Sequence, residues 1–412
     1  MDTVLAAGTA ASSARAEPAV AARPGPVDLF RVFFGIGLTS FGMAILQNIR
    51  TVPVKRGWLS RDEIDEGLGL VQLYPGAIMV DLVAYIGYRT ARLWGALAAT
   101  TGFIAPSLGL MLGLSALYAA VGTAPAMASL VTGLDAIVVG VVASVAVDFA
   151  GQHARRRVGA TLALAAFALG VLGASTLWAV LGGLVIGAMA MRPGAAPGGP
   201  AAPEGGAVMS GPRLARALVP GLLVLVGVGA AALAGGVIGG LSVSMATIGS
   251  LAFGNGSTIL PVLQQEAVAS HHWLTLQQFG VGVGFGQVTP GPFLISAAFI
   301  GYQVAGPLGG VLATVAIFAP SVAMTTVAAE VYPYLRRHAW VKGAIAGVMA
   351  VFVGLLATVV LSLGRLVLPI PAALVLSAAA FVAVRVFKWN LPATFAVGLG
   401  AWGAFMVLGG SL

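Results

Sequence analysis

Apolar segments long enough to cross a lipid bilayer follow one another through almost the whole chain. Thirteen can be distinguished, at 29–49, 66–88, 92–118, 126–150, 158–173, 176–191, 214–236, 239–262, 276–302, 306–332, 341–363, 370–387 and 391–410. A membrane helix needs about 20 such residues. Because 8% of the 412 residues are charged, against about 25% in soluble domains, most of the surface must face lipid. The chain is therefore predicted to be an all-α polytopic membrane protein.

The remaining charges exclude several classes of function. The net charge is +8, but the cations lie in short clusters between apolar segments, which is typical of membrane orientation and argues against nucleic-acid binding. The chain has no cysteine and 4 histidines, and it offers no convincing nucleophile–base pair or metal-ligand cluster. We therefore predict neither an enzyme nor a cofactor or metal site. The adjacent His271 and His272 are expected to lie in an external loop, in an interfacial role.

The chain contains an internal duplication. Motifs of the first half return in the same order in the second half, 212 to 215 positions later. The pairs are SFG (40–42) with AFG (252–254), WLS (58–60) with WLT (273–275), QLYPG (72–76) with QVTPG (287–291), IGY (86–88) with IGY (300–302), and APS (105–107) with APS (319–321). So ordered a series indicates that one membrane unit was duplicated and fused, as is common in secondary transporters.

The duplication defines the predicted domains. Residues 1–26, rich in Ala, Ser and Pro, are predicted to form a disordered cytoplasmic tail, and residues 27–191 the first membrane repeat. A Gly/Pro/Ala-rich cytoplasmic linker at 192–213 and a linking transmembrane helix at 214–237 lead to the second repeat at 238–412.

The positions of Lys and Arg suggest a topology. If all thirteen segments crossed the membrane, the basic loops at 50–61 and 155–157 would lie on opposite sides. If instead the first two segments of each half are re-entrant, every Lys and Arg except Arg365 becomes cytoplasmic. The halves are then inverted-topology repeats, each with a pair of broken helices followed by spanning helices. The N-terminus is cytoplasmic and the C-terminus external.

The interruptions of these re-entrant segments are the predicted anion site. Helices that start inside the membrane leave backbone N–H groups unpaired, and such groups attract oxyanions. The predicted binding residues are Phe41, Gly42, Gln72, Pro75, Gly76, Gly254, Asn255, Gly256, Ser257, Thr258, Gln287, Thr289, Pro290 and Gly291. Gly and Pro also kink membrane helices without any ligand. Recurrence of both breaks in both halves favours a functional site.

Carboxyl groups within apolar segments are the predicted proton-coupling groups. Asp81 lies just past the Pro75-Gly76 break in the stretch VDLVAYIGY, where an ionisable group is costly and usually functional. The alternative is an ion pair with Arg89. Asp135, in the middle of its segment, is the second candidate, whereas Asp148 is expected to cap a helix or to pair with Arg155.

The basic loop before the first Pro-Gly break has further predicted features. Ser60 and Glu63 fit a helix capping box. The cations that precede the break are mainly topology signals, and they could also form an anion-concentrating funnel at the cytoplasmic mouth. They are Arg50, Lys55, Arg56 and Arg61.

These motifs resemble the chromate ion transporter family, in its long-chain, two-domain bacterial form. The likeness is carried by AFGNGSTILPVLQQEAV, WLTLQQF, GQVTPGPFLISAAFIGY and IFAPS in the second half, and by SFG, KRGWLSRDE, QLYPG, IGY and APS in the first. The resemblance implies export of chromate, a tetrahedral dianion shaped like sulfate, across the bacterial inner membrane, coupled to protons. It leaves open the oligomeric state, a homodimer included.

The first half departs from the family pattern. The family commonly has FGGP where this chain has Phe41 to Ala44, polar residues where it has 77–80, and glutamate at the position of Asp81. These changes affect the identity of the substrate more than membership of the family. A transporter of sulfate or another oxyanion, and a passive anion channel of the same fold, remain the alternatives, and the internal repeat favours a carrier over a channel.

Overall fold

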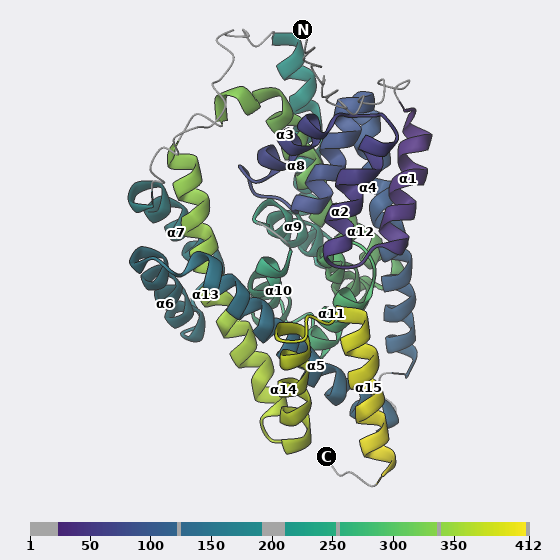
Figure 1. Cartoon of the computed structure of the whole chain (residues 1–412), viewed down its shortest axis with the longest axis vertical. Coiled ribbons are helices and arrows are strands. Elements are labelled where there is room, and N and C mark those ends of the chain that lie inside the picture. The colour runs from purple at the N-terminus through teal and green to yellow at the C-terminus, as the bar shows by residue number, and fades with distance from the viewer. Residues whose placement is uncertain (1–23, 122–124, 192–210, 253–255, 336–338, 409–412) are drawn as a thin grey trace, which may run out of the picture.

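The computed structural model describes residues 24–121, 125–191, 211–252, 256–335 and 339–408 (Figure 1). Within these ranges the secondary structure is helical, as the sequence predicts. The helices are α1 (Pro26–Thr39), α2 (Met43–Lys55), α3 (Arg61–Val71), α4 (Ile78–Val121), α5 (Pro125–His153), α6 (Arg157–Val171), α7 (Thr176–Ala190), α8 (Gly211–Ala234), α9 (Gly236–Ser250), η1 (Ser257–Ile259), α10 (Leu260–Gln264), η2 (Gln265–Ser270), α11 (Leu276–Val288), η3 (Phe293–Ile295), α12 (Ser296–Leu335), α13 (Ala339–Val367), α14 (Pro371–Arg385) and α15 (Leu391–Val407).

Four helical stretches are long and apolar enough to cross a membrane. They are Ile78–Val121, Ala128–His153, Phe293–Val331 and Trp340–Val367, so the two that follow the interruptions in the first half have counterparts in the second half. Shorter apolar helices at α6, α7, α8, α9, α14 and α15 accompany them. The chain is therefore an all-α polytopic membrane protein, as predicted.

The long helix α4 folds back on itself near its start. Its backbone leaves helical geometry at Ala91 and Arg92, and the φ of Arg92 is +56°. Beyond this point Gly95 packs against the backbone of Gly87. Eight residues of a straight helix span about 12 Å, so this contact requires the arms 78–90 and 93–121 to lie side by side. The predicted separation of the segments 66–88 and 92–118 falls at this fold-back.

The second half repeats this geometry. In α12 the backbone leaves helical geometry at Ala305 and Gly306, with a φ of +62° at Gly306, and Gly309 packs against Gly301. All four positions lie 214 residues after their counterparts in α4. Two helices with the same fold-back and the same glycine contact are difficult to explain without the duplication.

Helix starts are repeated as well. Ser60 caps α3 by accepting a hydrogen bond from the Glu63 N–H, and the Glu63 carboxylate accepts one from the Ser60 N–H, which confirms the predicted capping box. At α11, 215 residues later, Thr275 and Gln278 form the same reciprocal pair. Both helices therefore begin in the same way after a Trp-Leu-Ser/Thr turn.

The long arms of α4 and α12 pack against each other and run antiparallel. The start of one contacts the end of the other, where the guanidinium of Arg92 lies 3.3 Å from the carboxylate of Glu330. Further along, Gly310 packs against Leu112. Because residue numbers rise along one arm as they fall along the other, the two equivalent helices point in opposite directions.

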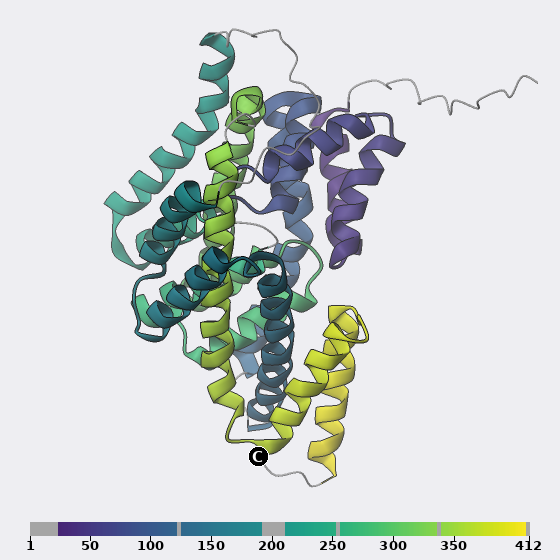
Figure 2. The same ribbon diagram turned by 60° about the vertical axis from the view of Figure 1, so that its left-hand side comes forward.

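The two halves exchange helices around this central pair. Helix α13 of the second half packs against α6 and α7 of the first, and α5 of the first half packs against α14 and α15 of the second. Figures 1 and 2 show α1–α3 and α14–α15 toward opposite ends of the long axis of the molecule. The last two helices of each half therefore pack against a helix of the other half.

The domain boundaries drawn from the sequence stay predictions. Most of the predicted tail (1–26) and of the linker (192–213) lies outside the described residues. The linking helix predicted at 214–237 corresponds to α8, which begins slightly earlier, at Gly211, and ends at Ala234. The segment predicted at 239–262 contains α9, the second-half interruption and the start of α10.

Candidate functional site

The first Pro-Gly interruption lies between α3 and α4 and carries Asp81 just inside α4. The Asp81 side chain is fully buried. Its carboxyl group occupies the space in front of Gly76, so that a methyl group at residue 76 would overlap it. The glycine of this Pro-Gly pair is thus required by packing. Asp81 belongs to the interruption itself, as its position in the sequence predicts.

The polar neighbours of Asp81 come from the other half of the chain. The hydroxyls of Ser321 and Thr325, one turn apart on α12, face its carboxyl group. Thr325 also lies 2.7 Å from the Tyr74 hydroxyl, and Ser321 accepts a hydrogen bond of 3.4 Å from the N–H of Ala77. Among the described residues, no direct hydrogen bond reaches either carboxylate oxygen. The charged form of so buried a group is costly.

Asp81 does not pair with Arg89, the alternative partner considered above. The Arg89 guanidinium lies 3.1 Å from the carboxylate of Glu63, at the surface. Burial raises the pKa of Glu63, but the Ser60 N–H and Arg89 more than offset it and hold that pKa below its usual value. Glu63 is therefore ionised at neutral pH and holds Arg89 away from the interruption.

The second Pro-Gly interruption, between α11 and η3, makes the reciprocal contact. Gly291 has a φ of +105° and packs directly against the Ser107 side chain. Ser107 belongs to the first-half APS motif, and Ser321 to the second-half one. Each Pro-Gly interruption therefore lies on the serine of the opposite half. This crossing brings both interruptions to the central pair of α4 and α12.

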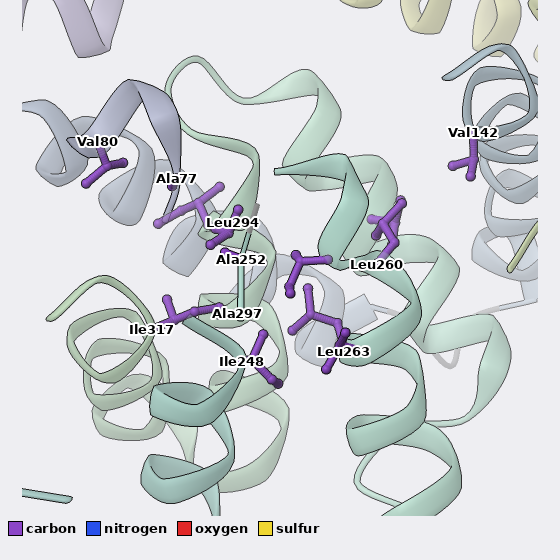
Figure 3. Close-up of a cluster of buried hydrophobic side chains, with 14 of the residues drawn as sticks. Ala77, Val80, Val142, Ile248, Ala252, Leu260, Leu263, Leu294, Ala297 and Ile317 are labelled. Carbon is purple, nitrogen blue, oxygen red and sulfur yellow. The ribbon is translucent and has the colours of Figure 1, made fainter. Parts of the chain in front are cut away.

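The side chains where the interruptions meet are small or apolar. Ala77, Leu294 and Ala252 belong to one buried hydrophobic cluster, which also includes Ile248 and Ile317 (Figure 3). The segment η3 packs against both α4 and η1. The polar groups at this point are backbone N–H groups at helix starts, the nearby hydroxyls and the Asp81 carboxyl group.

Other predicted binding residues of the second half lie close to this cluster. Thr258 is fully buried, and Gln287 and Thr289 are buried at the end of α11. The side-chain nitrogen of Gln287 has no hydrogen-bond partner within the described ranges. Gly256, with a φ of +83°, packs on Leu294. Gly254 and Asn255 lie outside the described residues, as does the side chain of Ser257.

The first-half SFG interruption is not brought to the others. Phe41 is 38% exposed, and Gly42 is exposed with open space on its Cβ side. Gln72, at the C-terminal cap of α3, is also exposed. The first half thus contributes Pro75, Gly76 and Asp81 to the centre, while its SFG turn remains at the surface.

The second predicted coupling residue, Asp135, packs against the second hairpin, which is the segment from α9 to the fold-back of α12 and corresponds to the first hairpin, from α1 to the fold-back of α4. Its side chain lies on α5, is 3% exposed, and packs against Gly280 of α11. One of its oxygens has no hydrogen-bond partner in the described part of the chain. The site therefore has two buried carboxyl groups nearby: Asp81 at the first interruption, and Asp135 against α11, the helix that leads to the second.

Two sequence expectations about polar residues need revision. The prediction that Asp148 pairs with Arg155 is wrong, because its carboxylate forms an ion pair with Arg385 at the end of α14. The sequence also gave no role to Ser107, Ser321, Thr325 and Tyr74. Two signals in the sequence could have indicated such a role. One is the APS motif, which occurs in both halves, and the other is the spacing of Ser321 and Thr325, which lie one helical turn apart. His271 stacks on Trp273 and lies 3.3 Å from the Glu266 carboxylate, and its interfacial role stays a prediction.

The fold and this site define a polytopic membrane protein of two similar halves whose interrupted hairpins meet across the halves. The model of the chromate transporter family matches the chain twice, at residues 27–188 and 239–404. The protein therefore belongs to the chromate transporter family, as the motifs suggested. No solved structure matches the chain.

Several relatives cover most of the chain. A chromate transport protein of Cupriavidus metallidurans is 30% identical over 380 residues, which are 89% of this chain and 88% of that protein. An uncharacterised transporter of Methanocaldococcus jannaschii is 26% identical over 351 residues, 84% of this chain and 86% of the relative. A probable chromate transport protein of Synechococcus elongatus is 28% identical over 352 residues, 82% and 84% of the two chains.

Proposed function

We propose that this protein is a secondary active transporter that exports chromate from the cytoplasm and couples the movement to protons. The observation that carries the proposal is the reciprocal crossing, in which each Pro-Gly interruption lies on the serine of the opposite half and the first has the buried Asp81 carboxyl group beside it. Membership of the chromate transporter family, with a relative named as a chromate transport protein, supports the choice of substrate.

Backbone donors are the proposed anion ligands. Helices α4 and η3–α12 begin at the two Pro-Gly interruptions, and the first N–H groups of a helix lack intrahelical acceptors and carry partial positive charge. The Ser321 hydroxyl adds a side-chain group at the same place, whereas the hydroxyls of Ser107 and Thr325 donate to backbone carbonyls of their own helices. Such a site is electrically neutral, so it can release a dianion as well as bind it. A tetrahedral oxyanion offers acceptors in every direction and suits converging donors.

Inverted insertion of the two halves would allow this site to open alternately to either side. The antiparallel run of α4 and α12 supports such an arrangement, as does the positive-inside distribution of Lys and Arg. The exchange of α6–α7 and α14–α15 between the halves ties each half to the other. A movement of one hairpin relative to the central pair of α4 and α12 would then also shift helices of the other half.

Asp81 is the proposed coupling residue because its charge and that of the anion exclude each other. A carboxylate and a dianion repel at this short range, and burial strengthens the repulsion. The anion therefore enters the first interruption when Asp81 holds a proton. Asp135, which lies on α5 and packs against Gly280 of α11, is the proposed partner in proton movement.

The experiment is chromate uptake into inverted membrane vesicles, with the membrane potential clamped. Clamping is necessary because a dianion gains about 4–5 kcal/mol from 100 mV, which would hide the contribution of the pH gradient. Wild-type uptake should saturate and depend on the imposed pH gradient. Asp81→Asn, a permanently neutral group of the same size, should remove the dependence on the gradient.

Asp148→Asn is the matched control, since Asp148 is an acid at the surface in an ion pair with Arg385, and it should leave the pH dependence intact. Uptake that ignores the gradient and saturates poorly in the wild type would indicate a channel. Full inhibition by sulfate, with sulfate itself transported faster, would identify sulfate as the substrate instead.

A further inference from the structure

A hollow of about 540 Å³ opens between α2 and α3, away from the buried interruptions. Its lining combines an apolar floor with charged walls. The lining residues are Leu46, Gln47, Arg50, Thr51, Val54, Lys55, Arg61, Ile64 and Asp65. It therefore contains three cations and one carboxylate.

Helical spacing explains why these charges share one hollow. On α3, Arg61 and Asp65 lie one turn apart and share a face with buried Ile64. The other acids of the helix are directed elsewhere: Glu63 pairs with Arg89, and Glu66 also interacts with Arg89. The acidic residues of α3 thus neutralise a different cation and leave the hollow with an excess of positive charge.

One ion pair crosses the hollow. The Arg50 guanidinium of α2 lies 2.6 Å from the Asp65 carboxylate of α3, and both side chains are about half exposed. Lys55 and Arg61 line the hollow without an ion pair among the described residues. An anion entering the hollow would be attracted by these two cations. It could also replace Asp65 as the ion-pair partner of Arg50, because an exposed ion pair is weak.

The second hairpin has no equivalent. Between Ala217 and Leu335 the charged residues are Glu266 and Glu330, although α10 and α11 follow the same helix order as α2 and α3. The positive-inside rule accounts for cations in a cytoplasmic loop, but it does not require them to line one hollow. The asymmetry therefore indicates a function at the face where an exported anion is loaded.

We propose that the hollow between α2 and α3 is a loading site that binds a free divalent tetrahedral oxyanion before it reaches the buried interruptions. The proposal rests on the proposed function for its direction, from the cytoplasm inward. Its chemistry is that of sulfate-shaped dianions, and Arg50, Lys55 and Arg61 are the ligands. The site raises the local concentration of the substrate and thereby the rate at which it is captured.

The absence of native cysteine allows a test that does not depend on transport. In the full-length protein in inverted vesicles, Thr51→Cys places a thiol in the hollow. We expect an anionic thiol reagent with a sulfonate group to modify it about tenfold faster than a cationic reagent with a trimethylammonium group. Inorganic sulfate should slow the reaction relative to chloride at equal ionic strength. Sulfate is the probe because chromate oxidises thiols.

Matched variants separate a built site from general positive charge. Gln152→Cys lies beside Arg155, Arg156 and Arg157 on an exposed stretch, and sulfate should not protect it. In the Thr51→Cys background, neutralising Arg50, Lys55 and Arg61 to Gln should abolish protection, whereas Arg56→Gln should preserve it. Gln47→Cys provides a second thiol in the hollow if Thr51→Cys fails to fold.

Lipid headgroups carry similar chemistry, so vesicles of phosphatidylcholine are compared with vesicles containing phosphatidylglycerol. Sulfate protection in both supports the proposal. Protection by phosphatidylglycerol with no added effect of sulfate would show a lipid site and overturn it, as would equal sulfate protection of Gln152→Cys or none at Thr51→Cys. Asp81→Asn should keep the protection. Sulfate protection combined with pH-independent chromate uptake would refute the proposed coupling but leave the loading site standing.

Discussion

At the first interruption there is no room for both a side chain at residue 76 and the Asp81 carboxyl group. The Asp81 carboxyl lies where a side chain at residue 76 would be, and the Asp81 side chain is completely buried. A buried carboxyl cannot move toward water to relieve a clash. The size of residue 76 and the position of the carboxyl are therefore coupled, and the coupling can be measured.

Gly76→Ala should destabilise the folded protein by about 1–3 kcal/mol, because the added methyl group overlaps a packed side chain. Shortening the opposing side chain with Asp81→Ser should restore stability in the double variant, whereas Asp81→Asn, which is as large as Asp, should not. Thermal unfolding in lipid nanodiscs measures both effects. Gly109→Ala is the control: with open space at its Cβ position, it should be neutral or slightly stabilising. Rescue by Asp81→Asn would show that charge, not size, causes the strain.

Sequence reasoning located Asp81 but not its neighbours, for a physical reason. A lone acid in an apolar stretch is visible locally, because its desolvation cost demands a function or a partner. Ser321 and Thr325 lie 240 and 244 positions away, and serine and threonine are ordinary in membrane helices, where their hydroxyls can bond to the preceding turn. Thr325 does so, donating to the Ser321 carbonyl at 2.7 Å. Only the tertiary arrangement shows that these hydroxyls also face a carboxyl.

At the scale of the elements, the fold-backs of α4 and α12 have the same backbone geometry but different residues at the position with positive φ. Both α4 and α12 need a residue in the left-handed region, and the second half uses Gly306 where the first uses Arg92. A non-glycine residue pays about 1–2 kcal/mol for this conformation. Arg92 recovers part of that cost through Glu330 and the ring of Tyr88.

Reciprocal substitutions should therefore have opposite effects. Gly306→Ala should lower the free energy of unfolding by about 1 kcal/mol through backbone strain alone, because no atom lies near its Cβ position. Arg92→Gly relieves the strain and loses an ion pair in which Arg92 is 74% exposed, worth at most about 1 kcal/mol, so stability should stay level or rise. Thermal unfolding of both variants checks the pair. A clear loss of stability in Arg92→Gly would mean that its contacts outweigh the strain.

The sequence predicted where helices begin and break better than it predicted which helices pack together. Apolar runs, Pro-Gly pairs and capping residues are local signals, so the helix starts at α3 and α11 and the breaks in both halves could be located. The exchange of α6–α7 for α14–α15 could not, because apolar helices carry no local signal of which neighbour they face. The surface position of Phe41 and Gly42 also escaped prediction, since the same motif occurs in both halves.

At the scale of the whole molecule, contacts and charges agree on which helix ends lie together. The pair of Arg92 with Glu330 joins the start of the long arm of α4 to the end of α12, and the pair of Asp148 with Arg385 joins the ends of α5 and α14. The positive-inside count predicts that each of these pairs lies on the cytoplasmic side. An arrangement in which all thirteen predicted segments cross the membrane would separate the basic loops at 50–61 and 155–157.

Single cysteines in the cysteine-free chain test this orientation. Lys55→Cys and Arg156→Cys should react with a membrane-impermeant thiol reagent from the cytoplasmic face, and His271→Cys from the outside, if the equivalent hairpins are inserted with opposite orientation as predicted. Labelling intact cells and inverted vesicles in parallel distinguishes the faces, and permeabilised cells serve as the control for access. Reaction of Lys55→Cys and Arg156→Cys from opposite faces would require the first hairpin to cross the membrane. The central crossing of the Pro-Gly interruptions could then no longer be the meeting point of two re-entrant elements, and the carrier proposed here would lose its basis.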